Sequence, residues 1–299
     1  MKINSLSGYL KKQFGTKVYK LSLSAGCTCP TRDGTISYGG CIFCSEGGSG
    51  DFASSFDSIE VQIEKAKQKV ESKFPKKIPD EDRKYIAYFQ SFTSTYGNEE
   101  RLMKLFETAC SFKEIAAVSI GTRPDCISDK MLSFLSKLNR KKPVWIELGL
   151  QTIHQKSADF IKRGYCLPQF EKTYYALKKE NLTVIVHLIL GLPGETENQM
   201  LESVKYLASL SPVLDGIKLQ LLQVLEGTEL AQIYKTSPFK IFTMEEYANL
   251  LVKCLKLLPQ QTVVHRITGD GPKRILIEPK WCGNKKAVLN YLTRFIDAY

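Results

Sequence analysis

Three cysteines near the start of the chain have a spacing that suits a metal cluster. Cys29, Cys41 and Cys44 lie within CPTRDGTISYGGCIFC, where eleven residues separate the first two cysteines and two residues separate the last two. Two thiolates separated by two residues can bind one metal or cluster, and a third from across a loop closes the site. The glycine pairs 39–40 and 47–48 let backbone amides approach the sulfurs. Three ligands on four irons would leave one iron open.

An open iron has a definite chemical use. It can bind the amino and carboxylate groups of S-adenosylmethionine (SAM) and pass an electron to its sulfonium, and the carbon radical that results can abstract unreactive hydrogens. The alternatives are a structural loop without metal and a structural zinc site, which normally needs a fourth ligand. The three histidines, at 154, 187 and 265, lie outside the cysteine loop, so zinc would need Cys27 or a distant residue.

Six apolar, β-branched runs are predicted to be buried strands. The runs are Lys17–Ser24, Tyr85–Ser91, Ile115–Gly121, Val144–Leu150, Thr183–Leu190 and Gly216–Val224. Amphipathic stretches with helix-start signals, such as Ser128 or Asp57 with Glu60, lie between them. This alternation predicts a parallel sheet, and nearly continuous hydrophobicity predicts that helices cover the strands. The predicted fold class is α/β, a partial (β/α)6 TIM-type barrel with a C-terminal helical extension; a doubly wound open sheet is the alternative.

The chain is predicted to divide near residue 230. Residues 1–230 would form the barrel with a basic lead-in, and residues 231–299 a basic extension packed on it. The extension should hold helices near Thr243–Leu258 and Asn284–Asp297, separated by the polar stretch Thr268–Lys280. In either architecture chemistry takes place at the carboxyl ends of the strands. The residues that directly follow the strands are therefore the candidate site residues.

The positive charge of the chain is concentrated at its two ends. The formal net charge is +11, and residues 21–230 hold 26 basic and 26 acidic side chains. A balanced middle between basic ends suits a catalytic core flanked by surfaces for a polyanion such as RNA or DNA. Lysine-rich ends that only aid solubility are the alternative. The start of the chain lacks a signal-peptide pattern and no long apolar run follows, so we expect a cytoplasmic location, no membrane and reduced thiols.

The cysteine loop and several later motifs resemble one family of proteins. With YFQSFTSTY, SIGTRPDC, ELGLQT, HLILGLPGET and HRITGDGP, the loop is similar to radical SAM proteins related to the Elongator catalytic subunit, and most similar to a bacterial branch implicated in modifying the wobble uridine of tRNA. The similarity runs from about residue 15 to the C-terminus. It implies a [4Fe-4S] cluster, SAM and an electron donor such as flavodoxin or ferredoxin. The acetyl-transfer domain of Elongator relatives is not expected in a chain of this length.

Cys27 is the alternative first ligand, because with Cys41 and Cys44 it would give C-x13-C-x2-C. The family pattern places the ligand directly before proline and an Arg-Asp-Gly turn, which favours Cys29. Buried thiol packing is expected for the remaining cysteines, Cys110, Cys126, Cys166, Cys254 and Cys282.

Residues that follow the other strands are candidate SAM ligands. The resemblance places the SAM amino group near Gln90 and Ser91, for which ordinary turn hydrogen bonds are the alternative. Glu147 is costly in a covered strand unless it is paired or faces a cavity, so it either contacts the ribose or methionyl group or forms an internal ion pair with Arg123. His187 either faces the cavity or is a satisfied core residue. The expected set is Gln90, Ser91, Arg123, Glu147, Gln151, His187 and Gly191.

A second set of basic residues is expected to contact RNA. The polar HRITGDGP motif could close the barrel mouth or touch the substrate, and a row of basic residues follows it. Without interleaved aromatics beyond Trp281, this surface is predicted to bind phosphates rather than read bases. The expected set is Arg163, Arg266, Lys273, Arg274, Lys285 and Lys286.

The predicted function is reductive cleavage of SAM, with a 5′-deoxyadenosyl radical that abstracts hydrogen from an RNA-bound substrate. The resemblance suggests the substituent at carbon 5 of the tRNA wobble uridine, for example a carboxymethylaminomethyl group. One alternative is a radical SAM enzyme for a small metabolite or protein side chain, with incidental basic ends. The other is a zinc-binding RNA module without catalysis.

Overall fold

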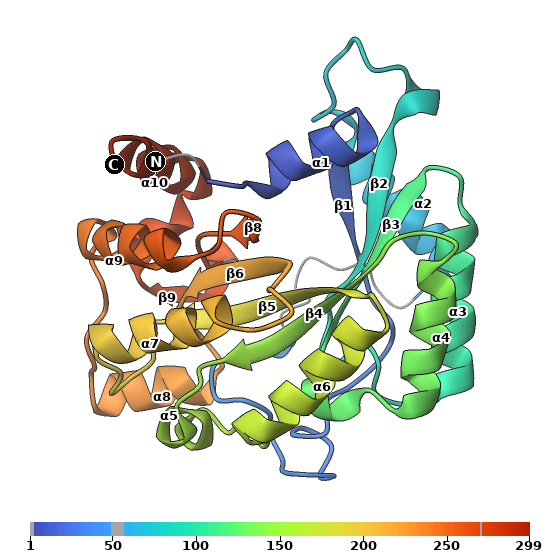
Figure 1. The fold of residues 1–299 in the computed structure, drawn as a ribbon. Helices are drawn as coiled ribbons and strands as arrows, with labels where there is room; N and C mark the ends of the chain where they lie inside the picture. Colours follow the sequence, from blue (N-terminus) through green and yellow to red (C-terminus); the bar gives the residue numbers. More distant parts are fainter. Residues whose placement is uncertain (1–2, 49–56, 270) are drawn as a thin grey trace.

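Seven parallel strands form one curled sheet, a half-barrel, in the computed structural model (Figure 1). The structure describes residues 3–48, 57–269 and 271–299, so Asp270 of the HRITGDGP motif lies outside the described residues. In spatial order the strands are β1 (Val18–Leu23), β2 (Lys84–Phe89), β3 (Ile115–Thr122), β4 (Val144–Gln151), β5 (Thr183–Leu190), β6 (Gly216–Leu221) and β8 (Val263–Arg266). The predicted α/β partial barrel is confirmed, with one strand more than the six runs indicated.

The additional strand comes from the segment after residue 230. β8 pairs in parallel with β6, and Val264 also bridges to Ser5 on its other side. Its four residues include His265 and Arg266, so the segment is too short and too polar to produce a strand signal. The division near residue 230 stays a prediction, although the main sheet takes strands from both sides of it.

The sixth predicted run splits in two. β6 ends at Leu221, and the short β7 (Val224–Leu225) pairs antiparallel with β9 (Leu276–Glu278) in a separate two-stranded sheet. This small sheet joins the end of the sixth strand to the C-terminal segment. It places residues 271–280 on the side of the carboxyl ends of the strands, where Gly269 and Gly271 line a cavity.

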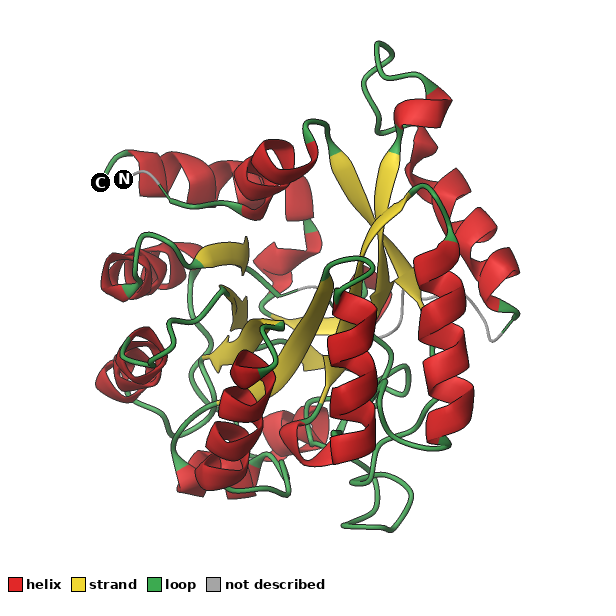
Figure 2. Cartoon of the chain, turned by 45° about the vertical axis from the view of Figure 1, so that its right-hand side comes forward, coloured by secondary structure: helices red, strands yellow, loops and turns green. Residues whose placement is uncertain are grey.

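Helices cover the outer face of the half-barrel (Figure 2). The α-helices are α1 (Leu6–Phe14), α2 (Ile59–Glu71), α3 (Glu99–Ser111), α4 (Asp129–Asn139), α5 (Gln155–Phe160), α6 (Leu167–Lys179), α7 (Glu197–Ala208), α8 (Glu229–Thr236), α9 (Met244–Leu257) and α10 (Lys285–Asp297). Side-chain caps start several of them: the Ser128 hydroxyl accepts from the Met131 amide at 3.0 Å, and Thr243 forms a capping box with Glu246. Short 3-10 helices occur at Asp80–Asp82, Pro124–Cys126, Lys273–Ile275 and Lys280–Gly283.

Alternating residues of the strands pack on two different cores. The outward side chains, such as Phe89, Val118 and Leu148, join the helices in a large buried apolar cluster. The inward side chains build the barrel interior in layers. α1 packs against both β1 and β8, and its Leu10 joins Trp145 in a small apolar cluster at the amino ends of the strands. We call this cluster, Leu10, Val18, Ile86, Ala117, Trp145 and Ile185, the barrel floor.

Candidate active site

The cysteine loop, residues 24–48, leaves β1 and folds over the carboxyl ends of the strands. Tight turns hold it: the Cys29 carbonyl accepts from the Arg32 amide at 2.8 Å, and the Cys41 carbonyl accepts from the Cys44 amide at 3.0 Å. The Arg32 guanidinium donates to the carbonyls of Cys44 and Ser45 at 3.2 and 2.5 Å, which ties the two arms of the loop together. Gly40 makes room for this arginine, since a Cβ there would lie 2.8 Å from its Nε.

Cys29, Cys41 and Cys44 line one cavity, which we call the cysteine cavity. It has a volume of about 160 Å³ and lies at the carboxyl ends of the strands, where the half-barrel opens. Cys27 is not among its lining residues; its thiol donates to the Ala25 carbonyl at 3.7 Å, outside the cavity. The three cysteines that the family pattern favours therefore share one cavity, whereas Cys27 does not line it.

The three thiols have the chemistry of cluster ligands. Within the described ranges, no three His, Cys, Asp or Glu side chains converge closely enough to hold a single metal ion. Ligands of a multi-iron cluster bind different irons and need not converge on one point. The pKa of the Cys41 thiol is raised, first by its contact with the Cys44 thiol and second by burial. The nearby Arg123 and Arg32 guanidinium groups oppose this rise. Two cations beside three thiols suit a site that must hold thiolates.

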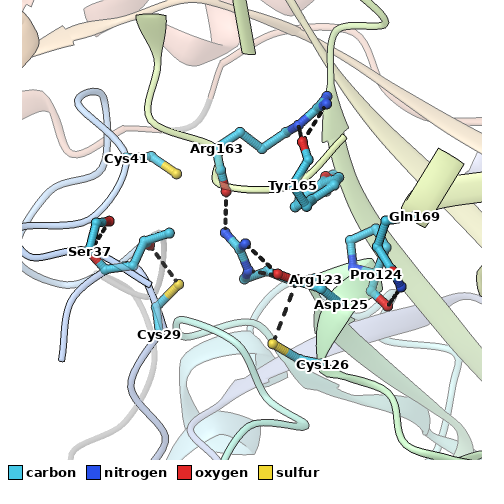
Figure 3. Close-up of polar contacts among 12 residues, drawn as sticks. Cys29, Ser37, Cys41, Arg123, Pro124, Asp125, Cys126, Arg163, Tyr165 and Gln169 are labelled. Carbon is cyan, nitrogen blue, oxygen red and sulfur yellow. Dashed lines mark hydrogen bonds and ion pairs between the residues drawn. The ribbon is translucent and has the colours of Figure 1, made fainter. Parts of the chain in front are cut away.

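Arg123 is fixed beside the cysteines by two partners (Figure 3). Its Nε and Nη2 bind the Asp125 carboxylate at 2.9 and 2.7 Å, and its Nη1 donates to the Arg163 carbonyl at 2.7 Å. Burial would lower the pKa of Arg123, but Asp125 raises it, so the side chain stays cationic. It lines the cysteine cavity next to Cys29 and Cys41. The predicted ion pair between Arg123 and Glu147 is wrong, because Arg123 pairs with Asp125.

Arg163 is not available to RNA, contrary to the prediction. Its side chain is 1% exposed and donates to three backbone carbonyls, those of Leu150, Thr152 and Tyr165, at 2.6–3.0 Å. The guanidinium also lies 4.4 Å from the centroid of the Tyr165 ring. Arg163 therefore fixes the segment after β4, and its carbonyl holds Arg123.

Glu147 lies at the centre of a buried charge network inside the barrel. Its Oε1 accepts from Lys20 and from Ser119, each at 2.7 Å, and its Oε2 accepts from Lys218 and lies 2.8 Å from His187 Nε2. Burial alone would raise the pKa of Glu147, but the two lysines hold it well below its ordinary value. Glu147 also lines the cysteine cavity, so it is both paired and at a cavity. Its charged partners are lysines and not Arg123, and its contact with SAM stays a prediction.

Lys20 and Lys218 were missed by sequence reasoning. Lys20 falls within the first predicted strand run, where no role was assigned to it, but its side chain is 19% exposed and pairs with Glu147 inside the barrel. Lys218 is 2% exposed on β6 and bonds Tyr88 Oη at 2.8 Å as well as Glu147. The usable signal was alternation: in GIKLQL, Lys218 and Gln220 occupy the inward positions between outward Ile217 and Leu219.

His187 faces the same network and lines the cavity. Burial and the field of Lys218 lower its pKa from 6.5 to about 4, although Glu147 opposes the shift. The side chain is therefore neutral near pH 7. Of the two alternatives for His187, its position therefore fits a residue that faces the cavity and not one that only packs in the core.

The remaining predicted SAM contacts divide between cavity and scaffold. Gln90 and Gln151 line the cysteine cavity and also a neighbouring cavity that continues from it toward Gln223. Gln151 has a φ of 63° at the end of β4, an uncommon conformation outside glycine. Ser91 and Gly191 are not among the lining residues: Ser91 is buried and its carbonyl accepts from Ser94, and the Gly191 amide contacts Met200.

The basic residues predicted for RNA have different positions. Arg266 lines the cysteine cavity, whereas an outer surface holds the exposed Lys273, Arg274, Lys285 and Lys286. In both views the beginning of α1 lies near α10, so these two helices lie toward the same side of the molecule (Figures 1 and 2). In the described part of the chain, no helix is long and apolar enough to span a membrane.

A curled parallel half-barrel with its cavity at the carboxyl ends of the strands is the arrangement of barrel enzymes. The model of the radical SAM superfamily matches residues 35–207, and that of the radical SAM C-terminal domain matches residues 214–297. The chain belongs to the radical SAM superfamily and is an enzyme of that class. Membership implies a [4Fe-4S] cluster and SAM, and it excludes the zinc-binding module without catalysis.

Relatives confirm the predicted family resemblance. YtqA of Bacillus subtilis is 38% identical over 295 residues, which are 98% of this chain and 89% of YtqA. A tRNA uridine(34) acetyltransferase of Methanocaldococcus jannaschii is 30% identical over 196 residues, 64% of this chain and 34% of that protein. Among solved structures, the archaeal Methanocaldococcus infernus Elp3 with an N-terminal deletion matches with a TM-score of 0.66 and 21% identity, over 93% of this chain and 63% of that one. The last similarity concerns the fold.

Proposed function

We propose that Cys29, Cys41 and Cys44 hold a [4Fe-4S] cluster beside SAM, and that the enzyme modifies tRNA at the carbon-5 substituent of the wobble uridine. A carboxymethylaminomethyl group is the candidate substituent. The observation that carries the proposal is that these three cysteines line one cavity with the strand-end residues Glu147 and Gln151, in a chain related to a tRNA uridine(34) acetyltransferase. Acetyl transfer itself is not part of the proposal.

The bound cluster would supply an electron to SAM and so give access to carbon-radical chemistry. The chain's own residues prepare the site for it. Arg123 places a fixed positive charge beside Cys29 and Cys41, and at Cys41 this charge opposes the rise of the thiol pKa. The Thr31 hydroxyl lies 3.1 Å from Cys29 Sγ and can donate to a thiolate there. The Arg32 guanidinium donates to the Cys44 carbonyl and so fixes the arm of the loop that carries Cys44.

SAM would occupy the space between the cysteines and the strand ends. Gln90, Gln151 and His187 offer neutral donors and acceptors there, and Arg123 and Arg266 offer positive charge for a carboxylate. Ser91 and Gly191 would act by shaping the loops that follow β2 and β5. The neighbouring cavity, which shares Gln90, Gln151 and His187 with the cysteine cavity, would receive the substrate group.

The basic ends would bind the tRNA backbone. The helices α1 and α10 lie toward the same side of the molecule, and Lys273, Arg274, Lys285 and Lys286 are exposed. A polyanion held there would have to extend from this side to the mouth of the cysteine cavity, which a tRNA is large enough to do. We further propose a cytoplasmic location and an electron donor such as flavodoxin or ferredoxin.

Anaerobic reconstitution tests the proposal. The protein is loaded with iron and sulfide and incubated with dithionite, SAM and total tRNA, followed by nucleoside mass spectrometry. We expect SAM-dependent loss of one wobble-uridine nucleoside and gain of another. Alanine at position 29, 41 or 44 should abolish both the cluster absorbance and the reaction, while Cys27→Ala, whose thiol lies nearby outside the cavity, should retain both.

Two results would contradict different parts of the proposal. A Cys29→Ala protein with unchanged cluster absorbance would refute the ligand assignment. SAM cleavage by the wild type without any change in tRNA nucleosides, together with tRNA binding no stronger than to a neutral polymer at low salt, would refute the tRNA substrate and favour a small-molecule or protein substrate.

A further inference from the structure

Lys218 is a buried amine that faces the cysteine cavity. It lies at an inward position of β6, is 2% exposed and is still among the residues that line the cavity. Its Nζ bonds Tyr88 Oη at 2.8 Å and the Glu147 carboxylate, and it lies 4.7 Å from the centroid of the Tyr88 ring. Neither cluster binding nor SAM binding, as described above, uses this side chain.

The charges around Lys218 favour the loss of its proton. One carboxylate, Glu147, faces both Lys20 and Lys218, and Arg266 lies directly opposite Lys218 on β8. Lys20 keeps 19% of its side chain exposed, whereas Lys218 keeps 2%. Burial, Lys20 and Arg266 all lower the pKa of Lys218, and only Glu147 opposes them. The titratable or charged groups that face it are Lys20, Tyr88, Glu147, His187, His265 and Arg266.

A buried lysine that can give its proton to a neighbouring carboxylate, beside a phenol, is a known chemical device. Desolvation and neighbouring cations turn a lysine into a nucleophile toward carbonyl carbons. We propose that Lys218 is a carbonyl-binding residue, which condenses with a small α-oxo acid inside the cysteine cavity to form an imine. This activity goes beyond the proposed tRNA modification and needs neither the cluster nor SAM.

The condensation is balanced with the groups present. Glu147 takes the proton of the Lys218 ammonium, and the free electron pair of Nζ attacks the carbonyl carbon. A second proton passes from nitrogen to the carbonyl oxygen, which becomes a hydroxyl. The hydroxyl leaves as water when Glu147 returns the first proton, and the third proton stays on the nitrogen of the protonated imine. One C–N double bond forms, one C–O double bond is lost, and no oxidant or reductant is required. Tyr88 Oη, 2.8 Å from Nζ, can hold the oxygen during the transfer.

The preference for an α-oxo acid follows from Arg266. Its guanidinium lines the cavity and its strand position is opposite that of Lys218, so a carboxylate next to the reacting carbonyl could bind there with two hydrogen bonds. The cavity volume of about 160 Å³ far exceeds what one water molecule needs, about 10–15 Å³ on the same scale. A compound as small as glyoxylate or pyruvate fits this space when SAM is not bound.

Reductive trapping tests the proposal with glyoxylate as the probe. The full-length protein is incubated anaerobically at pH 7 with glyoxylate and sodium cyanoborohydride, which reduces an imine to a stable secondary amine. Peptide mass spectrometry then measures the rate of adduct formation at each lysine. We expect Lys218 to react at least about tenfold faster than exposed lysines, because an unperturbed lysine has only about one molecule in 2,500 as free amine at pH 7.

Variants separate chemistry from folding. Lys218→Arg keeps the cation and cannot form the imine, so the fast adduct should disappear. Should this variant fail to fold, Arg266→Gln supplies the second measurement: it should slow trapping of glyoxylate about tenfold while leaving trapping of acetaldehyde, which lacks a carboxylate, nearly unchanged. If the rate of adduct formation at each lysine simply increased with the exposure of its side chain, and Lys218 stayed unmodified, the proposal would be overturned. Equal rates for glyoxylate and acetaldehyde in the wild type would overturn the assignment to α-oxo acids.

Discussion

Replacement of Glu147 by glutamine should destabilise the folded protein strongly. The carboxylate compensates two cations inside the barrel, Lys20 at 2.7 Å and the almost fully buried Lys218. Removal of one partner from a buried ion pair costs about 3–5 kcal/mol, because the other charge stays buried without compensation. The loss of stability also has an upper limit, because a lysine without a compensating charge can lose its proton. Deprotonation of a lysine with an unfolded-state pKa near 10.4 costs about 4.6 kcal/mol at pH 7. We therefore expect a loss of about 3–5 kcal/mol.

The same reasoning predicts how the loss depends on pH. In Glu147→Gln the folded state would bind fewer protons than the unfolded state, because a lysine is neutral only when folded. Stability of the variant should then rise with pH relative to the wild type, by up to about 1.4 kcal/mol per unit between pH 7 and pH 9. A simple packing defect would show no such recovery.

Urea unfolding at pH 7, 8 and 9 measures these quantities. The matched control is Glu226→Gln, since Glu226 pairs with Lys235 on the surface and both side chains are about half exposed, at 54% and 49%. Such a pair contributes about 0–1 kcal/mol. In the background of Lys218→Met, Glu147→Gln should cost clearly less than in the wild type, which reports the coupling of the two residues. A loss below about 1 kcal/mol at pH 7, or one that stays constant to pH 9, would refute the reasoning.

Three further predictions concern the site and the surface. The pKa of His187 is about 4 in the folded protein instead of 6.5, so the unfolded chain takes up a proton first as pH falls. The free energy of unfolding should therefore fall by roughly 3 kcal/mol between pH 6.5 and pH 4. In a plot of the urea midpoint against pH, His187→Gln should flatten this part of the curve. Gly40→Ala should lower the melting temperature more than Gly39→Ala, because both residues have φ near 85° but only at Gly40 would a Cβ meet Arg32; equal shifts would contradict this. Lys286→Ala should weaken tRNA binding and lower the salt slope by at most about one unit, as measured by filter binding from low to high salt.

The sequence predicted the repeated units of the fold better than its ends. Six strands followed from continuous apolar runs, because a strand covered on both faces needs such a run. The seventh strand, β8, was missed because its inward residues, His265 and Arg266, belong to the polar interior and its length is four residues. Pairing with β6 and the bridge to Ser5 hold it in the sheet, and these long-range contacts leave no local pattern.

The candidate site shows the same difference between local and long-range signals. The cysteines could be predicted because their function requires a fixed spacing within one loop. Arg163 was assigned to RNA by its position after β4, but three carbonyls of its own loop bind it, and no sequence pattern reports such backbone partners. The two lysine partners of Glu147 come from β1 and β6, more than 70 residues away in each direction. These pairs could be predicted only if the inward-facing residues of every strand and the register between the strands were known.

The layering of the barrel interior argues that the charge network serves chemistry rather than stability. The barrel floor is apolar and already fills the amino ends of the strands, with Trp145 1% exposed. An apolar second layer would be as stable or more so, because burial of Lys218 and Glu147 costs desolvation that their attraction barely offsets. The costly layer lies where the interior meets the cysteine cavity, and both residues line that cavity. The desolvation cost is therefore accepted where Lys218 and Glu147 line the cavity, which places an amine and a carboxylate within reach of a bound molecule. The trapping experiment tests this arrangement.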